Sequence, residues 1–422
     1  KGEKMKKKLL SLFSGCGGMD IGFEGGFKVP KQIINNKSHS YIDKENKKDI
    51  VLKKTFFKTM FANDINCYAK LAWEDYFSKS RTESIEEIYK VGSIVDIVKE
   101  YKKGNKDVFP QDIDIVTGGF PCQDFSVAGR RKGLKSHKDH NGNIILENIP
   151  NEETRGQLYI WMKNVIEITL PKIFIAENVK GLSNLGKVKE IIQKDFSKIN
   201  GDGYLVLPPQ ILHAGNYGIP QSRERIFFIG IKKSALTKQA LKELTEVEIK
   251  DQYSPYPMPT HDLNTDFVKC KTVLSDLKEP KDATDLSQIN YSKAKFMGKH
   301  CQGQKEINLD KLAPTIRAEH HGNIEYRRLS IEHGGKYLKE LKKDKDERRL
   351  TLRECARIQT FPDNFNFVIP EQKGKKRFSL SPSQGYRLVG NAVPPILAYH
   401  IAKKIEKNWD FYFDNKKEAK NA

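Results

Sequence analysis

Short apolar segments followed by glycine or polar residues constrain the fold of this chain more than any other feature. Five of them predict buried β-strands at Lys8–Phe13, Phe57–Ala62, Ile113–Thr117, Ile173–Ala176 and Arg225–Ile231. Helical patterns lie between several of these strands, namely Tyr68–Phe77, Leu158–Leu170 and Lys187–Ile199. This alternation predicts an α/β fold, with a mostly parallel sheet and helices on both of its faces.

The residues that follow the strands point to a single site. A glycine-rich stretch, Ser14–Gly18, follows the first strand, and Asp64 follows the second. Gly118–Cys122 and Glu177–Val179 follow the third and the fourth. Open parallel sheets bind ligands at the carboxyl ends of their strands. We therefore expect these four clusters to meet at one edge of the sheet.

The first two clusters suggest a nucleoside cofactor. The glycine-rich stretch departs from the dinucleotide fingerprint, because Asp20 stands where the third glycine would be. Its glycines still let a ligand approach the backbone, and Phe13 is suited to stack against a sulfonium cation. An ordinary tight turn is the alternative. Asp64 either accepts hydrogen bonds from ribose hydroxyls or caps the next helix.

The last two clusters suggest covalent chemistry. A thiol at a strand end, such as Cys122, becomes a nucleophile when nearby amides lower its pKa; otherwise it is an inert buried cysteine. Burial of Glu177 would raise its pKa and keep it protonated toward a substrate ring nitrogen, whereas a structural ion pair is the alternative. Arg223 and Arg225 share one strand face and suit phosphate or carbonyl oxygens, or simply form a charged edge.

Charge and cysteine content narrow the setting. A formal net charge of +20 over 422 residues indicates a polyanionic partner, or merely a lysine-rich composition. The six cysteines form no zinc-binding spacing, so we expect no metal and free thiols in a reducing cytosol. No apolar run approaches the ~18 residues that span a bilayer, which predicts a soluble intracellular protein.

The strand–helix alternation is interrupted in three places. Residues 30–54 and 135–154 are polar and are predicted to be loops. Residues 232–349 are predicted to form a separate domain. It would lie between a catalytic domain at residues 5–231 and a segment at 350–422 that returns to the catalytic domain.

Two helices are expected in the returning segment. Thr351 and Glu354 have the spacing of a capping box and predict a helix that begins there. A last amphipathic helix is expected at about Pro395–Trp409. The α/β character thus resumes after the irregular stretch.

Six motifs, in this order, resemble the cytosine-C5 DNA methyltransferase family of bacterial restriction-modification type. They are Leu-Phe-Ser-Gly-Cys-Gly-Gly, Gly-Phe-Pro-Cys-Gln-Asp-Phe-Ser, Glu-Asn-Val, Gln-Ser-Arg-Glu-Arg, Arg-Glu-Cys-Ala-Arg-Ile-Gln and Gly-Asn-Ala-Val. The resemblance covers Leu9–Ile231 and Leu350–Ile401. It implies a Rossmann-like S-adenosylmethionine-dependent methyltransferase sheet, with a smaller, irregular target-recognition domain at 232–349.

The same resemblance implies a mechanism. Cys122 would add to C6 of a cytosine that is flipped out of duplex DNA, after which C5 attacks the methyl group of S-adenosylmethionine. Glu177 would hold and protonate N3 of the ring. Arg225 would contact the cytosine carbonyl oxygen, and Arg223 would orient the same side. The sequence does not identify the base that removes the C5 proton; a water molecule is one candidate.

The remaining site residues are also carried over from the family. The implied cofactor-binding residues are Phe13, Gly15, Gly17, Asp64, Ile65, Ser93, Ile94, Pro121 and Asn391. The implied DNA contacts are Gln123, Ser126 and Arg130 in a loop that closes over the flipped base, and Thr315, Arg317, His320, His321 and Asn323 in the recognition domain, where a solvated polar loop is an alternative. Ser11 and Ser93 depart from the family, which usually has Asp at the first position and often at the second.

Other functions remain open on the sequence alone. They are methylation of RNA by the tRNA-acting branch of the family, a catalytically silent DNA-binding homologue, and, least supported, a Rossmann dehydrogenase. We expect a monomer that acts on a short duplex site in the cytoplasm, with a cognate restriction endonuclease acting separately. The sequence does not determine the target site or whether such an endonuclease exists.

Overall fold

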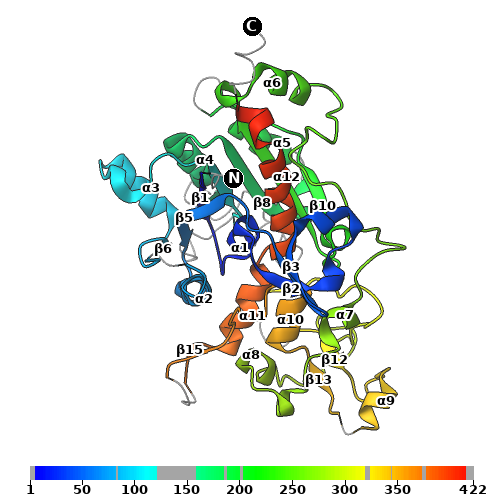
Figure 1. Ribbon diagram of the computed structural model, residues 1–422. Helices are drawn as coiled ribbons and strands as arrows, with labels where there is room; N and C mark the ends of the chain where they lie inside the picture. The colour runs from blue at the N-terminus through cyan, green and yellow to red at the C-terminus, as the bar shows by residue number, and fades with distance from the viewer. Residues whose placement is uncertain are drawn as a thin grey trace.

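A single sheet of eight strands forms the centre of the computed structural model (Figure 1). The structure describes residues 5–81, 84–120, 158–184, 188–199, 203–318, 324–343, 345–372 and 377–414. Along the sheet the strands follow the order β10-β11-β8-β7-β1-β5-β6, and β9 pairs with β11. No helix within these described ranges combines the length and the apolar character needed to cross a membrane.

Five neighbouring strands of the sheet are parallel. They are β1 (Lys7–Leu12), β5 (Phe57–Asp64), β6 (Tyr89–Val91), β7 (Ile115–Gly118) and β8 (Ile173–Val179). The other three are β9 (Tyr204–Val206), β10 (Gln210–His213) and β11 (Glu224–Lys232). Strand β11 runs antiparallel to β8, and β9 and β10 each pair antiparallel with β11. All five strands expected from the sequence are present, and the predicted α/β fold is confirmed.

Helices cover both faces of the sheet. One face carries α3 (Ile94–Lys102), α4 (Leu158–Thr169) and α5 (Val188–Ser197), and the other carries α1 (Gly18–Glu24), α2 (Cys67–Phe77) and α12 (Pro395–Phe413). Alternate strand residues point to opposite faces. Leu9 of β1 therefore belongs to one buried cluster and Leu10 to the other.

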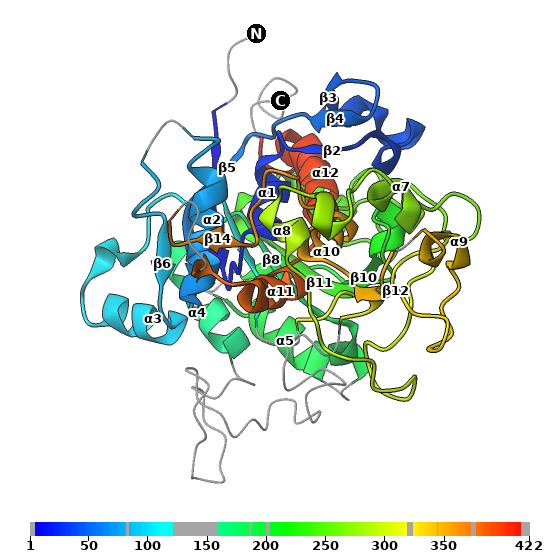
Figure 2. The ribbon, with the colours of Figure 1, turned by 90° about the horizontal axis from the view of Figure 1, so that it is seen from below.

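The end of the chain packs against its beginning. Helix α12 lies along α1, as Figures 1 and 2 both show. The approach is very close, because a Cβ atom added to Gly22 would lie 2.4 Å from the carbonyl oxygen of Pro395. At the start of α1, the same substitution at Gly18 would bring Cβ to 2.3 Å from the Val393 oxygen. The turn between α11 (Pro382–Asn391) and α12 is thereby held beside the glycine-rich loop.

Residues 30–54 are not the loop that we expected. They complete a three-stranded sheet with the order β2 (Lys28–Pro30), β4 (Asp49–Leu52), β3 (Ile42–Glu45). Tyr41 packs edge-on against Tyr399 of α12 at 5.6 Å, and the Tyr399 hydroxyl donates to the Lys53 carbonyl. The stabilising partner is at the other end of the chain, where local sequence patterns do not reveal it. The other expected loop, 135–154, lies outside the described residues.

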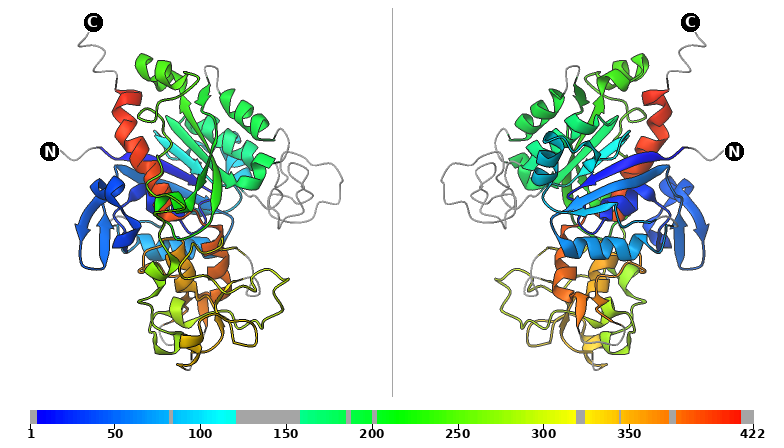
Figure 3. Two further views of the ribbon diagram at one scale, coloured as in Figure 1. Left: turned by 90° about the vertical axis from the view of Figure 1, so that its right-hand side faces the viewer. Right: turned by 90° about the vertical axis from the view of Figure 1, so that its left-hand side faces the viewer.

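The irregular segment occupies one end of the molecule, below the sheet in Figure 3. Its short elements are α7 (Cys270–Leu274), α8 (Leu286–Ile289), β12 (Tyr326–Arg328), α9 (Leu338–Leu341) and β13 (Arg348–Arg349). The next elements are α10 (Leu352–Ile358), β14 (Ile369–Pro370) and β15 (Phe378–Leu380). In contrast, α6 (Lys238–Leu244) stays with the sheet, because the Thr237 amide before it donates to the Tyr412 carbonyl.

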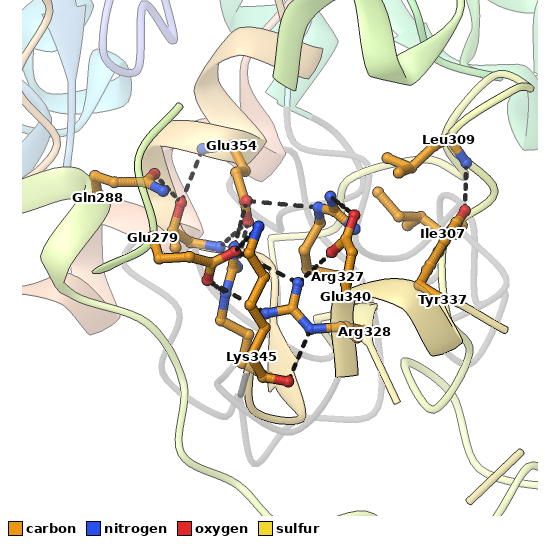
Figure 4. A network of polar contacts seen from close by, with 12 residues as sticks. Glu279, Gln288, Ile307, Leu309, Arg327, Arg328, Tyr337, Glu340, Lys345 and Glu354 are labelled. Carbon is orange, nitrogen blue, oxygen red and sulfur yellow. Dashed lines mark hydrogen bonds and ion pairs between the residues drawn. The ribbon is translucent and has the colours of Figure 1, made fainter. Parts of the chain in front are cut away.

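A buried network of three arginines and three glutamates ties the irregular segment to α10 (Figure 4). Arg348 donates two hydrogen bonds to Glu354, at 2.8 and 2.9 Å, and a third to Glu279 at 2.9 Å. The other members are Arg327, Arg328 and Glu340. Glu354 also closes the predicted capping box with Thr351, so the expected helix start is confirmed.

This network predicts acid sensitivity. Hydrogen bonds and charges from Arg348 and Arg328 lower the pKa of Glu279 to about 2, although burial opposes them. Glu279→Gln should reduce the free energy of unfolding at pH 7 by roughly 2–3 kcal/mol. Because the folded pKa is below the unfolded value, this contribution is present above about pH 4.5 and lost toward pH 2, so the deficit should shrink as pH falls.

Urea denaturation of both proteins at several pH values tests this expectation. The exposed Glu246 supplies the control, since Glu246→Gln should leave the midpoint unchanged. A deficit for Glu279→Gln that stays constant from about pH 7 to about pH 3 would contradict the ionic origin of the effect.

Candidate active site

A cavity of about 370 Å³ lies at the carboxyl ends of β1, β5, β7 and β8. All four strand-end clusters contribute to its wall. The lining residues from these clusters include Gly15, Asp64, Gly119 and Glu177, and the wall is completed by Phe13, Ile65, Ser93, Ile94, Arg225 and Asn391. The convergence expected from the sequence is therefore found, and Asn391 reaches the cavity from the C-terminal end of α11.

Gly15 and Gly17 of the glycine-rich loop have different structural roles. Gly15 and Gly17 both have positive φ angles, +52° and +84°, a region that favours glycine. A Cβ on Gly17 would collide with Trp73 at 2.5 Å, whereas a Cβ on Gly15 would meet nothing within 4 Å. Gly17 is thus required for packing, and Gly15 leaves the cavity wall open. Phe13 also has a positive φ, +50°, which marks local strain at this site.

Two side chains hold the Gly15 peptide from opposite sides. Asp64 accepts a hydrogen bond from the Gly15 amide at 3.0 Å, and the Tyr89 hydroxyl donates to the Gly15 carbonyl at 2.8 Å. Burial raises the pKa of Asp64, while hydrogen bonds from the amides of Asn66 and Gly15 lower it. The helix-cap alternative for Asp64 is not observed, because Asn66 caps α2.

Glu177 and Arg225 face the cavity from adjacent strands. Arg225 Nε lies 2.9 Å from Glu177 Oε1, and both side chains are nearly buried. Burial raises the pKa of the Glu177 carboxyl, and the charges of Arg225 and Arg223 oppose that rise. The structural ion pair considered at the sequence level is therefore present, but it lies in the cavity wall, where a ligand can reach it.

Arg223 is placed differently from our expectation. Its guanidinium is fully buried and donates to the carbonyl oxygens of Ile316, Gly390 and Ala392 at 2.9–3.1 Å. It does not line the cavity beside Arg225. A role in orienting substrate directly is replaced by a structural one, because the side chain joins its own segment to two others, at Ile316 and at Gly390–Ala392, through their main-chain oxygens.

Several expected residues cannot be placed. Cys122, together with Pro121, Gln123, Ser126, Arg130, His320, His321 and Asn323, lies outside the described residues. Phe120, two positions before Cys122, lines the cavity, and its carbonyl accepts a hydrogen bond from Asn178 at 3.1 Å. Phe120 is thus anchored to β8.

Two residues that were expected to contact DNA, Thr315 and Arg317, lie among the described residues. The Thr315 hydroxyl donates to the Ser222 carbonyl at 2.6 Å, and Arg317 lies 3.7 Å from Glu325. The backbone of Arg317 packs against Gly390, where a Cβ would come within 2.2 Å. This part of the irregular segment therefore lies against the C-terminal end of α11.

Sequence reasoning missed some contributors to the site. Asn178 was visible inside the Glu-Asn-Val motif but received no role, and nothing in the sequence pointed to Tyr89.

Ser93, which was expected from the sequence to bind the cofactor, also caps α3 with its hydroxyl, which accepts from the Val95 amide at 3.3 Å. A serine is well suited to that position.

The fold and the site define a class, an α/β protein whose central sheet ends in a cavity that is lined by a nearly buried acid–arginine pair. The family model for C-5 cytosine-specific DNA methylase matches residues 7–407. The chain therefore belongs to the C-5 cytosine-specific DNA methylase family and is an enzyme of that kind.

Individual relatives agree with the family model. The chain is 29% identical to Type II methyltransferase M.BsuRI of Bacillus subtilis, over 96% of this chain and 80% of that one. It is 31% identical to Type II methyltransferase M.HpaII of Haemophilus parainfluenzae, over 73% and 76%. Among solved structures, the Entamoeba histolytica methyltransferase EhMeth has a TM-score of 0.55 and 16% identity, over 96% of this chain and 99% of that one. The S. pombe Dnmt2 methyltransferase has a TM-score of 0.52 and 17% identity, over 95% of this chain and 99% of that one. Both show the fold alone.

The hydrogen bonds that hold the Gly15 peptide yield a prediction. Tyr89→Phe removes one neutral hydrogen bond from the Gly15 carbonyl, worth about 1 kcal/mol, so binding of S-adenosylmethionine, on which this family generally depends, should weaken roughly 5-fold. Isothermal titration calorimetry measures the change. Tyr101→Phe in α3 removes a hydroxyl elsewhere and should leave the affinity unaltered. Equal affinities for the wild type, Tyr89→Phe and Tyr101→Phe would contradict a role for Tyr89 in holding Gly15 against the cofactor.

Proposed function

We propose that this chain is the modification enzyme of a type II restriction-modification system. It methylates C5 of cytosine within a short duplex DNA site and uses S-adenosylmethionine as methyl donor. Support comes from the relatives, which are named Type II methyltransferases. The observation that supports the proposal is the cavity itself, because its lining brings Asp64 and the glycine-rich loop together with Glu177 and Arg225.

The cofactor wall suits S-adenosylmethionine. Asp64 offers carboxylate oxygens to ribose hydroxyls, and Ile65 and Ile94 supply apolar surface for an adenine ring. The open space beside Gly15 admits a ligand against the backbone. Phe13, Ser93, Pro121 and Asn391 complete the proposed set, and Gly17 maintains the turn. When bound, the sulfonium of this cofactor supplies an electrophilic methyl group.

The opposite wall suits a cytosine ring. We propose that Cys122 adds to C6, which makes C5 nucleophilic, and leaves once the C5 proton is removed. Glu177 would hold its proton at N3, where negative charge develops, and Arg225 would donate to the ring carbonyl oxygen. Burial supports this role of Glu177, because it raises the pKa of the carboxyl. Inside a duplex the base is inaccessible, so it must be flipped out.

The remaining proposals concern the partner. We keep the division into residues 5–231, 232–349 and 350–422, with the middle region reading the target site. Thr315, Arg317, His320, His321 and Asn323 are proposed to face DNA there, and Gln123, Ser126 and Arg130 beside the flipped base. The net charge of +20 supports a polyanionic partner. We propose a monomer that acts in the cytoplasm, with any cognate endonuclease acting separately.

Covalent trapping tests the nucleophile. Bisulfite sequencing of DNA from cells that express the chain first identifies the target. A duplex with 5-fluorocytosine at that position should then form an SDS-stable complex with S-adenosylmethionine present, because fluorine at C5 cannot be removed as a proton. Cys122→Ala should form none. Methyl transfer to tRNA but not to duplex DNA would instead favour the RNA-acting alternative.

The acid role of Glu177 is tested separately. Glu177→Gln keeps the shape but loses the proton that N3 requires, so the single-turnover rate should fall about 10²- to 10⁴-fold. Because burial raises the pKa of Glu177, the wild-type rate should fall as pH rises through that pKa. Rapid-quench measurements between about pH 5 and pH 9 reveal both effects. A wild-type rate that keeps rising over this range would exclude an acid role.

A further inference from the structure

Asp20 is a buried carboxylate that none of the steps above uses. It lies at the third residue of α1, directly behind the glycine-rich loop, and is fully buried. Its Oδ2 accepts hydrogen bonds from the Ser14 hydroxyl at 2.7 Å and the Trp73 indole at 2.8 Å. Its Oδ1 is also buried and has no hydrogen-bond partner among the described residues. A buried carboxylate is costly unless something nearby favours its charge.

The neighbouring hydroxyls connect Asp20 to the cavity. Ser11 and Ser14 both line it, and their oxygens lie 2.8 Å apart. A hydroxyl has one proton and two lone pairs. Since Ser14 donates its proton to Asp20, it must accept the proton of Ser11. Both hydroxyl protons are therefore engaged within this group, and the two serine oxygens that line the cavity are available to a ligand only as acceptors.

Local charge points the same way. The charge of Arg81 acts on Asp20, although the direct ion pair of Arg81 is with Glu24. Asp20 and Glu24 thus share one guanidinium. Burial raises the pKa of Asp20, whereas the hydroxyls, the Trp73 indole and Arg81 lower it. A cation in the cavity would further favour the ionised form.

The layout of the cavity limits which part of a ligand can reach Ser11 and Ser14. Asp64 ends β5, on one side of β1, where ribose is proposed to bind. Glu177 belongs to β8, on the other side of β1, where the methyl group must meet the cytosine. The amino-acid end of the cofactor remains for the glycine-rich loop between them. That end carries an ammonium group, which donates hydrogen bonds, whereas a sulfonium has none to donate.

We propose that Asp20, acting through Ser14 and Ser11, is a positioning residue that holds the ammonium group of the cofactor's methionine part. This inference rests on the proposed use of S-adenosylmethionine. It also gives a function to the acidic residue that breaks the dinucleotide fingerprint at Asp20. The carboxylate polarises the two hydroxyls, and they make the contact.

Three ligands separate this role from a purely structural one. S-adenosylmethionine has ammonium, carboxylate and sulfonium groups, S-adenosylhomocysteine keeps the ammonium and the carboxylate, and 5′-methylthioadenosine has none of the three. Loss of the negative charge of Asp20 would strengthen binding of a carboxylate, so weaker binding reports on the ammonium group. For Asp20→Asn, calorimetry should show about 10-fold weaker binding of the first two, since a hydrogen bond to a charged group is lost. Binding of 5′-methylthioadenosine should change less than about 2-fold.

Two further variants keep the test decisive. Ser14→Ala retains the carboxylate, so it should fold even if Asp20→Asn does not, and it should show the same ligand selectivity with a smaller loss. Asp96→Asn removes an exposed carboxyl from α3 and should bind all three ligands as the wild type does.

Each other outcome overturns the inference. Equal weakening of all three ligands would mean that Asp20 only supports the loop, and no weakening would mean that it is not involved. Weakening of S-adenosylmethionine alone would assign the charge to the sulfonium. If the wild-type protein bound neither S-adenosylmethionine nor S-adenosylhomocysteine, the proposed function itself would fail, which is a distinguishable result.

Discussion

The register of three parallel strands decides where chemistry can occur in this protein. Leu12, the last residue of β1, is paired with Asn63 of β5 and Gly118 of β7. The loops after these strands therefore begin at one level, and Phe13, Asp64 and Gly119 all reach the same cavity. A shift by a single residue would turn the side chains to the opposite faces and separate the clusters. The site is thus a consequence of how the sheet pairs.

Desolvation sets the electrostatics around that sheet. Burial raises the pKa of Asp20, Asp64 and Glu177, and in each case hydrogen bonds or arginine charges oppose the rise. At Glu279 the balance is reversed, because the arginines dominate and the pKa falls to about 2. Near the cavity burial dominates and favours the neutral carboxyls, whereas the arginines keep Glu279 ionised, and that network serves stability. The two kinds of site thus use the same interactions with opposite outcomes.

The parts that sequence reasoning recovered are those with a local cause. The five predicted strands were found because buried parallel strands need continuous apolar runs, and the capping box at Thr351 was found because its contacts span three residues. The failures have distant causes. The small sheet of residues 30–54 packs against Tyr399 near the other end of the chain. Arg223 turns inward because the carbonyl oxygens of Ile316 and Gly390 accept its hydrogen bonds.

The sequence by itself determined the order of the elements, the chemical groups at each strand end and the resemblance to a family. These follow from periodicity and from short motifs, which are local properties. Only the tertiary structure decided that Tyr89 and Asp64 clamp Gly15, that Arg225 pairs with Glu177, and that Asp20 lies behind two cavity-lining serines. Such contacts join residues far apart in the chain, and their geometry arises only when the sheet and its two helical layers pack together.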